Sequence, residues 1–108
     1  MASEVLAVAL NKEITNTEKV LLTVTSGHVF TVLNISICET AGAAETVDLY
    51  IDDGGTGTDY ELLSDQAVGA NETFELTTKF VISDEDHLCA EASAGNMDIV
   101  VSYLDQTR

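Results

Sequence analysis

The chain has 108 residues, and its 19 acidic residues outnumber the 4 basic ones, so its net charge is −15. This length suits one domain with a single hydrophobic core. The charge excludes nucleic acid as a favourable partner, because binding DNA requires Lys and Arg, and no apolar run approaches the ~18 residues of a membrane span.

Alternating apolar and polar residues recur along the whole chain, with turn residues between them and no proline. The first segment, Val5–Leu10, fits a short strand or a short helix, and Glu72–Ile82 is expected to be the longest strand. The other expected strands, in chain order, are Lys19–Val24, Val29–Cys38, Thr46–Ile51, Tyr60–Ser64, His87–Ser93 and Met97–Leu104. About eight short strands at regular spacing predict an all-β fold, a single antiparallel β-sandwich of Greek-key or jelly-roll-like arrangement.

The central stretch shows this alternation most clearly. Four apolar residues, Val29, Leu33, Ile35 and Ile37, are expected to share one face of their strand. The chain divides into residues 1–18, an N-terminal arm or first strand, and residues 19–108, the sandwich domain.

The residues that bind metals most often do not form a recognisable site. Cys38 and Cys89 lie on separate expected strands, and with His28 and His87 they lack the close-paired spacing of structural zinc sites. Two free thiols are favoured over a disulfide, because we expect a cytosolic product, in which cysteines stay reduced. The acidic glycine-rich segment Asp52–Asp59 has oxygen ligands of the kind calcium prefers, but a plain turn between strands is favoured. We therefore expect no metal and no cofactor.

The sequence also lacks a recognisable catalytic arrangement. Its two histidines lie beside turns, and no serine or cysteine stands in a nucleophile motif. Carboxylates are abundant, but glycosidase chemistry needs one with a raised pKa in a cleft. The chain is therefore not expected to be an enzyme.

Two groups of residues are candidates for contacting a partner. Tyr50 and Tyr60 flank the glycine-rich turn, with Tyr50 expected on the outer face, and they fit either a sugar or protein contact or ordinary cross-strand packing. The N-terminal segment is apolar at Val5, Leu6, Val8 and Leu10.

From Lys19 onward the chain has several distinctive motifs. They are VLNISICETAGAAETVDLYIDDGGTG, with its TVDLYI strand at Thr46–Ile51, the segment GANETFEL and the closing HLCAEASAGNMDIVVSYL. Together they resemble small β-rich virion proteins of tailed bacteriophages. The chain departs from this family at Thr25–His28, where a proline-asparagine turn is common, and in being more acidic. The motifs are turns and strands, so they indicate fold more specifically than role.

The resemblance implies a non-enzymatic virion protein, first of all a capsid decoration (cement) protein on the capsid exterior, assembled in the host cytoplasm. Its partner would be the expanded lattice of the major capsid protein, and a homo-oligomer, with a trimer favoured, is expected. The segment Ala2–Leu10 is expected to be an arm that docks on a neighbour or adds a strand to it. The alternatives are a tail-, neck- or fibre-associated virion protein, a carbohydrate-binding module, or a calcium-dependent adhesive domain.

Overall fold

The computed structural model describes residues 3–107, which form nine β-strands. The strands are β1 (Glu4–Ile14), β2 (Lys19–Thr23), β3 (His28–Glu39), β4 (Glu45–Asp52), β5 (Asp59–Val68), β6 (Thr73–Leu76), β7 (Phe80–Ser83), β8 (His87–Ala92) and β9 (Met97–Thr107). Within residues 3–107 there is no helix that is long and apolar enough to span a membrane.

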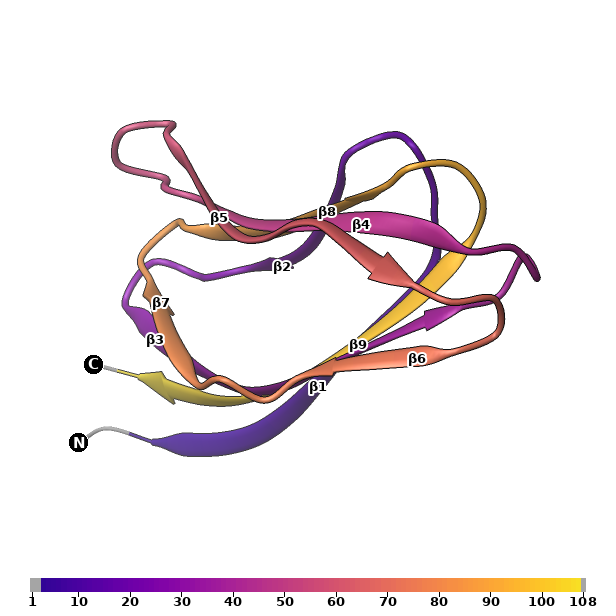
Figure 1. Cartoon of the computed structure of the whole chain (residues 1–108). Helices are drawn as coiled ribbons and strands as arrows, with labels where there is room; N and C mark the ends of the chain where they lie inside the picture. Colours follow the sequence, from indigo (N-terminus) through magenta and orange to yellow (C-terminus); the bar gives the residue numbers. More distant parts are fainter. Residues whose placement is uncertain (1–2, 108) are drawn as a thin grey trace.

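The strands form two antiparallel sheets that pack face to face (Figure 1). The five-stranded sheet has the order β1-β9-β3-β6, with β7 also paired to β3, and the four-stranded sheet has the order β2-β8-β4-β5. Successive strands mostly change sheet, and the first and last strands are neighbours. This order is jelly-roll-like, so the predicted all-β sandwich is confirmed.

The core lies between the two sheets and consists of aliphatic side chains from alternate strand positions. On β3 and β4, Ile35, Ile37, Val47 and Leu49 are fully buried or nearly so, as the sequence predicts. Met97, Ile99 and Val101 on β9 are fully buried beside them. A period of two therefore places each strand's apolar residues in the shared interior.

The predicted inner face of β3 is wrong in its first half. Phe30 and Val32 are buried there, whereas Val29 and Leu33 are only partly covered. The pairing of β3 with β9 shifts register between Val32 and Asn34, and this β-bulge at Leu33 moves the inward positions from even to odd numbers. An extra residue in one strand reverses the face of everything that follows.

Several other strands differ in extent from those predicted. β1 continues to Ile14, and β5 continues to Val68 through the expected loop, past Asp65 with a positive φ of 50°. The expected longest strand is instead two short strands, β6 and β7, because the polar residues 77–79 interrupt it. Both still pair with β3, and Phe74, Leu76, Phe80 and Ile82 all pack on the core.

A buried glutamate binds two of the connections between the sheets. Glu39, at the end of β3, is fully buried. Its Oε1 accepts the backbone N–H groups of Gly42 (2.9 Å), Ala43 (3.2 Å) and Asn71 (3.1 Å), and its Oε2 accepts that of Ala41 (2.7 Å). Burial opposes ionisation, but these donors outweigh it and lower the pKa of Glu39.

A second buried carboxyl, Glu45 at the start of β4, extends this arrangement to a third connection. Its Oε1 accepts the N–H of Ala94 at 3.2 Å, and its side chain is hydrogen bonded to that of Glu39. Burial, followed by the neighbouring Glu39, raises the pKa of Glu45. Its Oε2 is buried without a hydrogen-bond partner within residues 3–107, which adds to the cost of ionising this carboxyl group.

The pKa of Glu39 is lowered and that of Glu45 is raised, so the free energy of unfolding should decline toward both acidic and alkaline pH. The contribution of Glu39 is present above its ordinary pKa of 4.5 and is lost as pH falls through its lowered value. The contribution of Glu45 is present below 4.5 and is lost as pH rises through its raised value. Glu45→Gln keeps a donor toward Glu39, so it should remove the decline on the alkaline side, whereas Glu39→Gln should destabilise at neutral pH.

Urea unfolding of both variants and the unchanged chain, from about pH 4 to about pH 8, measures these effects. An unchanged pH dependence in Glu45→Gln would contradict the assignment of the proton to Glu45. Glu72→Gln, on an exposed loop, is the control for a general charge effect.

Candidate docking surface

The first strand is an edge strand whose outward side chains are apolar. β1 pairs with β9 on one side only, from Glu4 opposite Gln106 to Asn11 opposite Ile99. Leu6 is 74% exposed and Leu10 is 76% exposed, although both are leucines in regular strand structure. Leucine at such exposure on a strand suggests a surface that another molecule covers.

These side chains continue across the sheet onto β9. Leu6 lies opposite Leu104, and Leu10 lies opposite Val100. Directly paired residues share one face, so these side chains form an apolar surface over β1 and β9, which Leu33 of β3 extends. We call this surface the outer apolar face. Its members are Leu6, Val8 and Leu10 on β1, Val100 and Leu104 on β9, and Leu33 at the β3 bulge.

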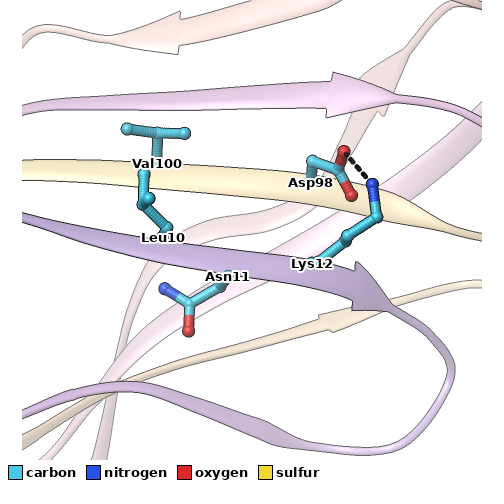
Figure 2. Close-up of a pocket in the computed structure, with 5 residues that line it drawn as sticks. All are labelled: Leu10, Asn11, Lys12, Asp98 and Val100. Atoms are coloured by element: carbon cyan, nitrogen blue, oxygen red, sulfur yellow. Dashed lines mark ion pairs between the residues drawn. The ribbon is translucent and has the colours of Figure 1, made fainter.

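Figure 2 shows one end of this face. Leu10 and Val100 lie side by side, while Asn11 points to the opposite side of the strand. Lys12 reaches Asp98, with Nζ and Oδ2 3.7 Å apart. These five residues line an open hollow of about 230 Å³.

A second hollow, of about 360 Å³, lies further along the same strands. Leu6, Val8 and Leu33 line it, together with Ala7, Ser102 and Tyr103. The β3 bulge therefore adds an apolar side chain to the outer face as well as reversing the inner one. The two hollows make the outer apolar face uneven, which favours a partner with protruding side chains.

The outer face of the four-stranded sheet has the opposite character. Asp48 is paired with Glu91, and Asp52 with Asp59, so like charges stand directly across from each other. We call Asp48, Asp52, Asp59, Glu61 and Glu91 the acidic face. Burial, followed by the charges of Asp48, Asp59 and Asp65, raises the pKa of Glu61. The two outer faces of the sandwich are therefore apolar and acidic.

The structure separates the two tyrosines that the sequence grouped together. Tyr50 is on the outer side of its sheet, as expected, but it is buried and its hydroxyl donates to the carboxylate of Glu18. Burial, followed by Glu18, raises its pKa. Tyr60 is 56% exposed and pairs with Ile51, whereas Tyr50 pairs with Glu61, so they face opposite sides of the sheet. The two rings cannot form one platform.

The N-terminal segment is not a free arm in the described residues. Glu4–Leu10 is part of β1 and pairs with β9, and Ala9 packs on the core; Ala2 lies outside residues 3–107. Of the predicted contact residues, Leu6, Val8 and Leu10 share the outer apolar face. Val5 is 57% exposed but has the opposite orientation, opposite Asp105.

The carboxylates at the glycine-rich turn accept hydrogen bonds from neighbouring groups of the chain. Asp53 Oδ1 accepts the N–H of Gly55 at 2.8 Å, and its Oδ2 accepts the hydroxyl of Thr56 at 3.1 Å. Asp86 Oδ1, in the neighbouring acidic turn, accepts the N–H of Gly54 at 3.1 Å. Both cysteines are free thiols, and burial raises the pKa of Cys89 to about 12. No group of three or more potential ligands that could hold a metal occurs within residues 3–107.

Two parts of this arrangement were missed from the sequence, although a signal was present. Val100 and Leu104 stand at positions that alternation assigns to the polar side of β9, and apolar residues there indicate a covered outer face. Glu39 and Glu45 likewise stand at inward positions, two residues beyond Ile37 and before Val47.

No protein-family model and no curated protein sequence matches the chain. Solved structures do resemble it. A protein of the Bacillus endospore appendages, described as disulfide-linked pili, aligns with a TM-score of 0.60 and 13% identity over 99% of this chain and 90% of its own.

Two phage capsid chains are also similar. A chain of the acid-stable capsid of Helicobacter pylori bacteriophage KHP30 aligns with a TM-score of 0.55 and 14% identity over 100% of this chain and 99% of its own. A chain of the cyanophage Pam1 capsid aligns at 0.50 and 13%, over 97% and 86%. At these identities the likeness shows the fold alone.

The paired like charges of the acidic face predict that a charge reversal stabilises the fold. Glu91→Lys replaces repulsion opposite Asp48 by attraction and should raise the free energy of unfolding by about 0.5–1 kcal/mol. Urea unfolding at low salt measures the change, and Glu91→Gln should give a smaller gain. The advantage of lysine should shrink in high salt. A loss of stability in Glu91→Lys would contradict the repulsion.

Proposed function

We propose that this chain is a non-enzymatic structural protein of a bacteriophage particle, and within that class a capsid decoration (cement) protein. The observation that carries the proposal is the contrast between the outer faces of its two sheets. One is apolar over β1 and β9, and the other is acidic. A small domain with these two faces is suited to lie on a surface with one side covered and the other in water.

The outer apolar face is the side that we assign to the major capsid protein. Leu6 and Leu10 are largely exposed and gain the most from burial, roughly 1.5–3 kcal/mol for each fully buried leucine. The acidic face then points away from the lattice. This orientation suits the capsid exterior, because a carboxylate surface next to packaged DNA would be repelled by its phosphates.

The likeness to the KHP30 and Pam1 capsid chains supports a virion role through the shared fold. A carbohydrate-binding module is less well supported, because Tyr50 is buried and faces away from Tyr60. A protein that binds only the expanded lattice would stabilise that state by mass action.

Particles that lack the protein should assemble but rupture at a lower temperature than complete particles. Heating both kinds and following DNA release with a dye measures the difference. Equal rupture temperatures would contradict the decoration role. Labelling of purified particles with an antibody should find the protein on the head, and labelling confined to the tail, neck or fibres would support the alternative virion role.

The docking face is tested on β9, away from the edge of the sheet. Val100→Thr with Leu104→Gln makes the outer apolar face polar and should weaken binding to protein-free particles about tenfold or more, for a loss of at least ~1.4 kcal/mol. Co-sedimentation measures binding, and thermal unfolding checks the fold. Asp48→Asn on the acidic face is the matched control and should bind normally. Equal binding by both variants would remove this face from the interface.

A further inference from the structure

Of the edge strands within residues 3–107, β1 is the one that lacks protection against pairing. From Val5 to Asn11 it carries no charge and pairs with β9 in regular register, and its charged residues and its register shift lie at its two ends. The edge strand β5 carries Asp59, Glu61 and Asp65, and its register is irregular twice. The remaining edges, β2, β6 and β7, have four or five residues each. Charge, irregularity and shortness are the usual means of blocking an edge.

The hydrogen bonds to β9 show which backbone groups of β1 are unused. The N–H of Thr107 donates to the carbonyl oxygen of Ser3 at 3.0 Å, so Ser3 directs its carbonyl toward β9. Backbone direction alternates along a strand. Glu4, Leu6, Val8 and Leu10 therefore direct their N–H and C=O groups away from β9, toward the open edge.

We propose that the open edge of β1 binds β1 of a second copy of this chain, antiparallel, about a twofold axis at Val8. Leu6 then lies opposite Leu10 of the partner subunit, and Val8 lies opposite Val8 of the partner subunit. All of these residues direct their backbone groups toward the open edge. Each such pair exchanges two hydrogen bonds, which satisfies the unused groups of both strands.

Charge selects this register over its neighbours. With the axis at Val8, Glu4 lies opposite Lys12 of the partner subunit, and the pair occurs twice. Moving the axis to Ala7 places Glu4 opposite leucine, and moving it to Ala9 places Lys12 opposite leucine. Both charged side chains lie on the same face of β1 as Leu6 and Leu10, so each ion pair closes one end of the apolar strip.

The dimer also joins the outer apolar faces of the two copies. Paired strands keep equivalent side chains on one side, so the two five-stranded sheets become continuous and their apolar faces point the same way. The acidic faces belong to the other sheets and lie away from this contact. The twofold arrangement differs from the trimer expected from the family resemblance, and it does not depend on the capsid role, because it forms without a capsid.

Sedimentation equilibrium of the complete purified chain at about 0.15 M salt should show a dimer. Glu4→Lys places lysine opposite Lys12 twice and should raise the dissociation constant about tenfold. Adding Lys12→Glu restores opposite charges and should return the constant to within about threefold of the original value. Glu13→Lys, beside the strip, is the control. A monomer, a trimer or a dimer indifferent to the exchange would overturn the proposal.

Hydrogen exchange tests the backbone pairing separately from side-chain contact. In the dimer the amides of Leu6, Val8 and Leu10 should exchange at least tenfold more slowly than in Val8→Lys, which puts two lysines opposite each other. The amides directed at β9 should be protected in both. Val8 is 54% exposed, so this variant should keep the fold of the monomer, although it loses the stability that dimerisation adds. A dimer in which these three amides exchange as fast as in the variant would overturn the strand pairing.

Discussion

The arrangement of the two sheets depends on one ionised side chain in the interior, Glu39. A buried carboxylate is costly unless donors replace its water, and four backbone N–H groups do so here. They come from the β3–β4 turn and the β5–β6 loop, and Glu45 adds the β8–β9 turn. All three connections run from one sheet to the other. Holding them together fixes how the two sheets meet at that end of the sandwich.

Much of the fold follows from the period of two, and the exceptions have identifiable causes. Ile35, Ile37, Val47 and Leu49 are inward as alternation requires. The bulge at Leu33 was not predicted, because an inserted residue leaves both faces apolar in the sequence and only the partner strand reveals the shift. The extension of β5 was hidden in the same way by the irregularity around Asp65.

The candidate docking surface was also predictable only in part, because its position depends on how the strands pair. Leu6, Val8 and Leu10 were predicted to contact a partner from an N-terminal arm, but sequence alone does not tell a free arm from an edge strand. That distinction comes from pairing with β9, at the other end of the chain. Tyr50 shows the limit of facing arguments, since an outward position was predicted correctly and yet Glu18 covers it.

The open edge of β1 and the outer apolar face would together give stronger binding than the face of a single copy. One copy has few exposed apolar side chains, each worth roughly 1.5–3 kcal/mol when buried, whereas association costs an estimated 4–15 kcal/mol in lost freedom. A single face of this size therefore binds weakly. In the proposed dimer, two faces joined through β1 would bind a repeating surface as one unit, because after the first has bound the second is already at high local concentration. A strand edge left unprotected, which is a hazard in an isolated domain, would then be the feature that lets a small acidic sandwich bind such a surface.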